Sequence, residues 1–236
     1  MNKVTLVLSL TAVESAALLL SLKVALWCTA FVSVPAVLIA WTLARKHFPG
    51  KALFDGVVHL PLILPPVVPG YLLLVLLGNQ GVLGKWLFEY LGLSIAFTWK
   101  GAVVASAVMA LPLMVRAVRL SIELIDLRYE QVAATLGAHP LRVFLTITLP
   151  LALPGILAGM ILAFSRSLGE FGATITFVGN IPGETQTLPL AIYSATQRPG
   201  GDEFAFRLVV LSILLSLGAL IASDLIARRV QRRLAR

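Results

Sequence analysis

The sequence predicts an all-α polytopic membrane protein with about five transmembrane helices, forming a single transmembrane domain over residues 1–236. Three observations lead to this fold class. Hydrophobic residues make up 58% of the chain, the mean hydropathy is +0.94, and charged residues make up only 13%. Soluble proteins carry about 25% charged residues. A soluble domain of this length needs more polar surface, so the apolar residues are expected in helices that cross a bilayer.

The apolar segments give the expected spans in order along the chain. These segments cover about 18–43, 53–77, 99–115, 154–172 and 206–227. Lys23 is expected near the outer end of the first span, where its long side chain reaches the headgroups. Prolines fall in or beside the first three spans: Pro35, Pro61, Pro65, Pro66, Pro69 and Pro112. Each removes a backbone donor and kinks its helix, which indicates either ordinary bends or a bundle shaped around a pathway.

The basic residues predict the orientation of these spans. Twelve Lys and Arg residues fall in 45–51, 116–149 and the tail after residue 227, against five on the opposite side. Basic loops stay in the cytoplasm, so we expect the N-terminus outside and the C-terminus inside. The net charge of +8 therefore reflects the membrane, with no nucleic acid partner. The long cytoplasmic segment 116–149 shows helical periodicity, whereas the outer segment 179–201 is rich in Pro and Gly and is expected to be irregular.

Composition also excludes several kinds of chemistry. A single cysteine, Cys28, excludes an internal disulfide and a thiolate metal cluster. The three histidines lie far apart and form no H-E-x-x-H pattern, which argues against a zinc enzyme. We therefore expect no catalytic residue, no metal site and no cofactor in this chain.

The most specific pattern lies in the cytoplasmic segment, where residues 130–150 read E-Q-V-A-A-T-L-G-A-H-P-L-R-V-F-L-T-I-T-L-P. This stretch resembles the EAA loop of ABC-importer permeases, which has E-A-A, three residues, Gly, nine residues, Ile, one residue and Leu-Pro. The residues at matching positions are Ala133, Gly137, Ile147, Leu149 and Pro150. Gln131 and Val132 replace the first two residues of the pattern, although Glu130 lies adjacent.

The residue types in this stretch suit a helix–turn–helix that docks a partner. A small side chain at Ala133 or Ala134 lets another surface approach closely, and Gly137 allows a turn that other residues resist. Pro140 can begin a second short helix, because its missing N–H costs little there. The expected coupling residues are Glu130, Gln131, Ala133, Ala134, Gly137 and Ala138. An amphipathic helix lying on the headgroups is the alternative.

The chain lacks the phosphate-binding motif of an ATPase. A P-loop needs G-x-x-x-x-G-K-S/T, and the nearest approach, at Gly84 and Lys85, has Asn79 and Trp86 at two required positions. The resemblance therefore implies that ATP and Mg are bound by a separate ATPase.

Three further stretches resemble the molybdate-permease subfamily of the sulfate/molybdate/tungstate group: 59–71, 111–119 and 163–193. The sequence G-E-F-G at 169–172 is shared with sulfate permeases, whereas G-N-I-P-G-E at 179–184 favours molybdate. The resemblance implies a homodimeric permease in the cytoplasmic (inner) membrane of a prokaryote. Its partners would be two cytoplasmic ATP-binding subunits and an extracytoplasmic oxyanion-binding protein. Tungstate would use the same site, and sulfate is the alternative substrate.

Two other classes fit the sequence less well. An ion-coupled secondary transporter needs acidic residues inside the membrane and usually internal repeats, but only Glu170 lies well inside a span and no repeat is found. A membrane-embedded enzyme needs converging His, Asp or Glu side chains. Asp55, His59 and Asp224 lie instead at predicted span ends, where we expect them to be solvated.

One charge is predicted well inside the membrane. Arg166 stands about twelve residues, or roughly 18 Å, into the fourth span, and such a charge faces the bundle interior and has a partner. Glu170 lies four residues on, on the same helix face. Two interpretations stay open, a structural ion pair or the edge of an anion pathway. The pathway candidates are Ser165, Arg166, Ser167, Glu170, Thr174 and Thr176.

Overall fold

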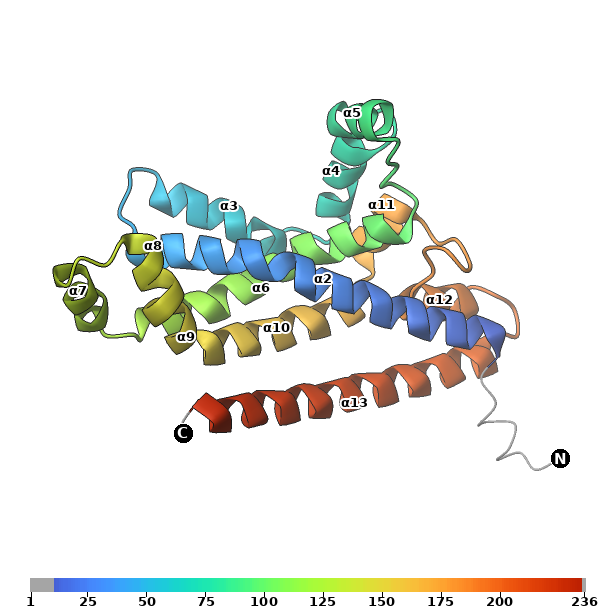
Figure 1. Ribbon diagram of the computed structural model, residues 1–236. Helices are drawn as coiled ribbons and strands as arrows, with labels where there is room; N and C mark the ends of the chain where they lie inside the picture. Colours follow the sequence, from blue (N-terminus) through green and yellow to red (C-terminus); the bar gives the residue numbers. More distant parts are fainter. Residues whose placement is uncertain (1–10, 235–236) are drawn as a thin grey trace.

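The computed structural model describes residues 11–234 and is a bundle of α-helices. Figure 1 shows its long helices lying side by side: α2 (Ala12–Arg45), α6 (Trp99–Glu123), α10 (Leu153–Leu168) and α13 (Asp202–Leu234). The hydrophobic core forms mainly between α2, α6 and α10, while α13 packs against α10 and α12 (Leu188–Thr196).

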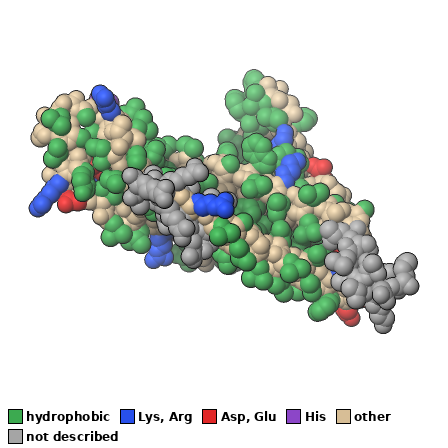
Figure 2. Space-filling model, turned by 60° about the horizontal axis from the view of Figure 1, so that its bottom comes forward, with side chains coloured by type: hydrophobic (Ala, Val, Ile, Leu, Met, Phe, Trp, Pro, Cys, Tyr) green, Lys and Arg blue, Asp and Glu red, His purple; other side chains and the backbone are tan. Residues whose placement is uncertain are grey.

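The described chain contains three helices that are long and apolar enough to cross a membrane, α2, α6 and the first 22 residues of α13. Two bent helix pairs raise this number to five if each pair is one span. Figure 2 shows a face covered largely by hydrophobic side chains, with few charges. A surface of this kind suits contact with lipid rather than water, and the predicted fold class is confirmed.

The predicted second span, 53–77, is broken rather than continuous. It consists of α3 (Lys51–Ile63) and α4 (Val67–Leu77), whose axes differ by 111°. Leu64 between them is extended, at φ −70° and ψ 144°. The ring of Pro65 disfavours the helical conformation for the residue before it, in agreement with the break at this point. By contrast, α2 and α6 continue through their internal prolines.

The first helix begins earlier than predicted. The Thr11 hydroxyl accepts the Glu14 N–H at 3.3 Å, and the Glu14 carboxylate accepts the Thr11 N–H at 2.7 Å. This capping box fixes the start of α2 at Ala12. Lys23 therefore lies well inside the helix instead of at its outer end. Its ammonium stands 3.6 Å from the ring centroid of Trp99, a cation–π contact that joins α2 to α6.

The predicted fourth span and outer segment also differ from the structure. The helix α10 ends at Leu168, so Glu170 lies in a short link before α11 (Gly172–Val178), which packs against α4. The outer segment 179–201 is not wholly irregular, because it contains α12. Figure 1 shows α4 and the following α5 (Val82–Leu91) projecting away from the long helices.

The segment predicted to be cytoplasmic forms short helices at the opposite end of the bundle from α12 (Figure 1). They are α7 (Leu127–Thr135), α8 (Pro140–Val143), the π-helix η1 (Phe144–Thr148) and α9 (Leu149–Leu151). Residues 116–123 belong to α6, so the connecting segment is shorter than predicted. In η1 the Leu149 N–H bonds to the Phe144 carbonyl. This wider turn accommodates Pro150, which has no N–H and crowds the carbonyl four residues before it.

Candidate functional site

The turn between α7 and α8 has the geometry that the sequence predicts. Gly137 adopts φ +82°, which side chains other than hydrogen resist. Its N–H donates to the Ala134 carbonyl at 3.0 Å, and the Ala138 N–H donates to the Ala133 carbonyl at 3.0 Å. These two bonds form a Schellman motif, which closes the C-terminus of α7. Pro140 then stands in the first turn of α8, as predicted.

A buried polar contact ties this turn to the bundle. The Glu130 carboxylate of α7 lies 3.0 Å from Arg45 Nε at the end of α2 and accepts the Thr148 hydroxyl of η1 at 2.9 Å. Arg45 also donates to the Ile125 carbonyl at 3.0 Å. These contacts join α7 to both α2 and η1. Sequence reasoning placed Arg45 in a basic loop and missed this role, because its partner lies 85 residues away.

The outer surface of the same element is apolar. Six large side chains around α7 and α8 are each at least half exposed: Leu124, Leu127, Tyr129, Val132, Leu136 and Leu141. Gln131 and Ala134 are exposed beside them, whereas Ala133 is half-buried. We call this the tip surface. Exposed apolar side chains gathered at the end of a bundle are typical of a site that contacts another protein or the membrane.

Arg166 and Glu170 form the predicted ion pair. Arg166 Nη1 lies 2.6 Å from Glu170 Oε2, and the Glu170 side chain is only 1% exposed. The other carboxylate oxygen accepts the Ala173 N–H at 2.8 Å, at the start of α11. Both oxygens are therefore engaged, and the pair joins the end of α10 to the start of α11. We call this arrangement the α10–α11 joint.

The remaining pathway candidates do not share one surface. Ser167 and Thr174 are buried, whereas Ser165 is exposed. The Thr176 hydroxyl donates to the Gly172 carbonyl at 2.8 Å, within its own helix. The structure thus brings Arg166, Ser167 and Glu170 together beside Cys28 of α2, and it leaves Ser165 on a different side of α10.

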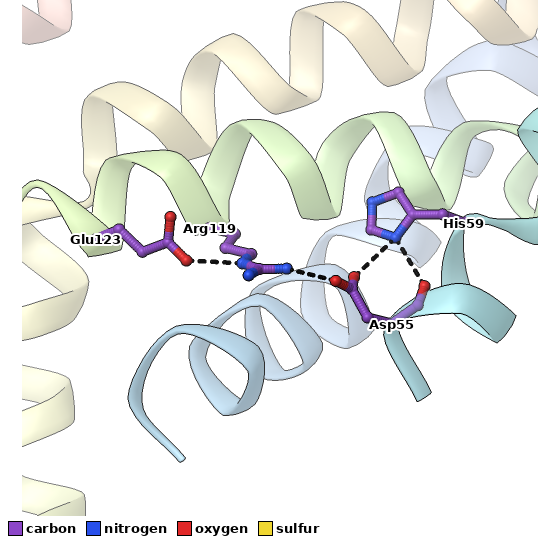
Figure 3. A network of polar contacts seen from close by, with 4 residues as sticks. All are labelled: Asp55, His59, Arg119 and Glu123. Carbon is purple, nitrogen blue, oxygen red and sulfur yellow. Dashed lines mark hydrogen bonds and ion pairs between the residues drawn. The ribbon is translucent and has the colours of Figure 1, made fainter. Parts of the chain in front are cut away.

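A second charged cluster joins α3 to α6 (Figure 3). Arg119 Nη1 lies 2.8 Å from Asp55 Oδ2, and Arg119 Nε lies 2.7 Å from Glu123 Oε1. His59 Nδ1 lies 3.0 Å from Asp55 Oδ1 and 2.9 Å from the Asp55 carbonyl oxygen. Because both of these atoms are acceptors, Nδ1 is the protonated ring nitrogen. We call this arrangement the α3–α6 joint.

The α3–α6 joint corrects the expectation that Asp55 and His59 are simply solvated residues at a span end. They are held to α6, whereas the side chain of Asp224 lies outside the described residues. Sequence reasoning missed Arg119 and Glu123. The sequence feature that could have revealed them is a charged face on an otherwise apolar helix, with Arg116, Arg119 and Glu123 at spacings of three and four residues.

The α3–α6 joint lines a cavity of about 850 Å³ between the two helices. Its charged lining includes Asp55 and Glu123 together with Arg116 and Arg119, and His59 lies at the same wall. Within residues 11–234, no three His, Cys, Asp or Glu side chains are arranged to hold a metal ion. The cavity wall thus carries two carboxylates and two guanidinium groups.

Comparison with known families decides the class of the protein. The family described as "Binding-protein-dependent transport system inner membrane component" matches residues 36–232. The chain belongs to this family. It is thus the inner-membrane permease component of a binding-protein-dependent ABC transporter and is not itself catalytic. Membership also implies two kinds of partner, an ATPase and a binding protein.

Close relatives in the family match nearly the full chain. The molybdenum transport system permease protein ModB of Haemophilus influenzae is 58% identical over 221 residues, covering 94% of this chain and 96% of the relative. ModB of Escherichia coli K12 is 56% identical over 227 residues, covering 96% and 99%. The E. coli sulfate transport system permease protein CysT is 36% identical over 203 residues, covering 85% and 73%.

A solved structure supports the fold of this family member. The inward-facing MetNI methionine ABC transporter matches with a TM-score of 0.71 and 16% identity, covering 98% of this chain and 99% of the matched one. At this identity the likeness concerns the fold alone. It agrees with a bundle in which several spans are bent or broken.

Proposed function

We propose that the chain carries molybdate into the cell as the permease of an ATP-driven importer, with tungstate using the same site. The observation that carries this proposal is the near-complete match to permeases named for molybdenum transport, which are much more similar than the sulfate permease. The G-N-I-P-G-E sequence at 179–184, which resembles the molybdate-permease subfamily, supports the same substrate.

The working unit is a homodimer that binds two cytoplasmic ATP-binding subunits. One ATPase docks on each tip surface, where Gln131 and Ala134 lie beside the exposed apolar side chains. ATP and Mg are held by the ATPase. The binding protein delivers the oxyanion at the α12 end. This arrangement places the N-terminus outside and the C-terminus in the cytoplasm, as the basic residues suggest.

Coupling runs through the contacts of Glu130. ATP binding moves the ATPase and with it α7, and the bond from Glu130 to Arg45 carries this movement into α2. The bond from Thr148 carries it into η1 and the helices that follow. The paired bundles then change from inward-open to outward-open. Gly137 and Ala138 keep α7 and α8 at a fixed angle during this movement.

The α10–α11 joint borders the pathway. Arg166 is quarter-exposed and Thr176 is half-buried, so both offer accessible surface there, while Ser165 is exposed on a different side of α10. Glu170 holds Arg166 in place, and Thr174 and Thr176 belong to the short helix that this pair positions. Hydroxyl groups with one partly neutralised cation bind an anion weakly, which allows the ion to pass on.

The coupling proposal is tested with Gly137→Val and Ala133→Trp. Valine at φ +82° is strained. A bulky residue at Ala133 pushes the ATPase away and should weaken its binding by about 1–3 kcal/mol, where each 1.4 kcal/mol corresponds to about tenfold in affinity. Both variants should assemble but lose the ATPase or hold it without transport. Co-purification of the ATPase and molybdate-stimulated ATP hydrolysis in proteoliposomes measure this result.

The matched control is Gly200→Val. Gly200 also has a positive φ, +74°, with open space around it, but it lies near α12 at the other end of the bundle. It should keep its ATPase. If both tip variants bind the ATPase and transport like the parent, the tip surface is not the coupling element. Transport driven without ATP would point to a secondary transporter, and equal uptake of sulfate would remove the preference for molybdate.

A further inference from the structure

The cavity between α3 and α6 contains a guanidinium group that no acidic side chain neutralises. Arg116 is exposed and lines this cavity, and it makes no ion pair or hydrogen bond with any residue in the described range 11–234. Arg119, three residues further on the same face of α6, is bound by both Asp55 and Glu123. Both carboxylates thus contact Arg119, and the N–H donors of Arg116 stay open.

We propose that this cavity is a second oxyanion site, on the release side of the permease, with Arg116 as the group that contacts the ion. The proposal rests on the proposed function for its ligand, a tetrahedral dianion such as molybdate. A guanidinium presents a planar fork of N–H donors that matches two oxygens of an oxyanion. Arg119 contributes charge from one turn away but has its donors engaged by Asp55 and Glu123.

The position of the cavity fits release rather than uptake. Arg116, Arg119 and Glu123 occupy the last turns of α6, directly before the segment that leads into α7. The proposed function places this end in the cytoplasm. The Arg166–Glu170 pair, in contrast, lies at the other end of α10. The cavity therefore lies at the end of the bundle from which the proposed function has the ion released.

The composition of the cluster makes the site weak. Asp55 and Glu123 repel an anion, and with Arg116 and Arg119 they bring the net charge of the cluster to zero, so the attraction comes from the open N–H donors of Arg116. His59 donates to Asp55 and keeps that carboxylate against Arg119. A weak site in a large cavity lets the ion leave into water, which a release site requires.

The test uses the full permease–ATPase complex in detergent, without nucleotide. Ala52→Cys places a thiol in the cavity wall, and its reaction with a cationic methanethiosulfonate reagent is timed with and without molybdate. The parent chain is the blank, because its Cys28 is fully buried. His47→Cys is the control, because His47 is exposed in the loop before α3 and does not line the cavity.

At ten times the dissociation constant a site is about 90% occupied, so molybdate should slow labelling of Ala52→Cys by about fivefold or more. Chloride at equal ionic strength should not slow the labelling of Ala52→Cys, and molybdate should leave the labelling rate of His47→Cys unchanged. Adding Arg116→Gln should abolish the protection, whereas Arg116→Lys, which keeps the charge but loses the fork, should retain part of it. Size-exclusion profiles verify that both variants stay assembled.

If molybdate still protects Ala52→Cys when Arg116→Gln is present, the proposed site is overturned. The same holds if chloride protects Ala52→Cys equally, or if molybdate protects the His47→Cys control equally. Uptake by the parent complex in proteoliposomes is measured in parallel. A parent that imports molybdate with ATP but shows no protection overturns the second site alone. A parent that imports no molybdate overturns the proposed function, whatever the labelling shows.

Discussion

The α10–α11 joint and the α3–α6 joint use the same chemistry in opposite surroundings. Each contains an arginine bound to a carboxylate at under 3 Å. At the α10–α11 joint the Glu170 side chain is 1% exposed and both its oxygens are engaged. At the α3–α6 joint the acidic side chains, Asp55 and Glu123, are 34% and 41% exposed, and they face a cavity of about 850 Å³.

This difference shows how burial decides what an ion pair can do. The α10–α11 joint is sealed on its acidic side: the Glu170 carboxylate is shielded from water while Arg166 is 26% exposed, so the carboxylate keeps its partner and the pair fixes how two helices meet. In the open joint, water and ions compete for Arg119, so the contact contributes little to stability but can respond to an anion. The predictions below test this distinction, from the largest expected effect to the smallest.

The sealed joint predicts the largest loss of stability. Arg166→Met leaves the buried Glu170 carboxylate without its partner, which should lower the free energy of unfolding by about 3–5 kcal/mol. Adding Glu170→Gln should recover most of this loss, because the amide oxygen still accepts the Ala173 N–H without a charge. Denaturation of the purified permease in detergent measures both variants.

Uptake by the double variant Arg166→Met/Glu170→Gln then separates the two interpretations of this pair. Normal molybdate uptake would remove Arg166 from the pathway and leave it a structural role. An assembled complex with poor uptake would place Arg166 at the pathway edge. A single variant as stable as the parent would contradict the idea that this joint is sealed.

The Glu130 contact predicts an intermediate effect, because its burial is intermediate. The side chains of Arg45 and Glu130 are 10% and 19% exposed. Glu130→Ala removes hydrogen bonds to a charged group and should cost about 1.5–3 kcal/mol, together with weaker coupling of ATP hydrolysis to uptake. The neighbouring Gln131→Ala is the control for stability, since Gln131 is exposed. If Glu130→Ala and Gln131→Ala lower the free energy of unfolding equally, the assigned role of Glu130 is contradicted.

The open joint predicts the smallest change in global stability and a local change in motion. Asp55→Asn should cost about 1 kcal/mol or less, as expected for a partly exposed ion pair. It should nevertheless speed amide hydrogen exchange in α3, because Val58 is the one buried residue of that helix. Glu123→Gln changes the second partner of Arg119. Because Glu123 does not reach α3, amide hydrogen exchange in α3 should stay slow in this variant. Equal exchange in the two variants would show that Asp55 does not hold α3.

Local features of this protein follow from sequence alone. The turn at Gly137, the start of α8 at Pro140 and the pairing of Arg166 with Glu170 each depend on residues within a few positions of one another. Such features are set by backbone conformations and by the helical repeat, which a sequence displays directly. The apolar composition likewise determines that the chain is a helical membrane protein.

Tertiary structure alone decided which distant groups meet. Asp55 and Arg119 are 64 residues apart, Arg45 and Glu130 are 85 apart, and Glu14 and Arg207 are 193 apart. Each contact depends on how two helices are rotated and shifted against each other, and the hydrophobic pattern does not fix that geometry. The 111° bend between α3 and α4 has the same origin. Pro65 explains why the helix breaks, but the packing of α4 against α11 sets the direction that the chain takes afterwards.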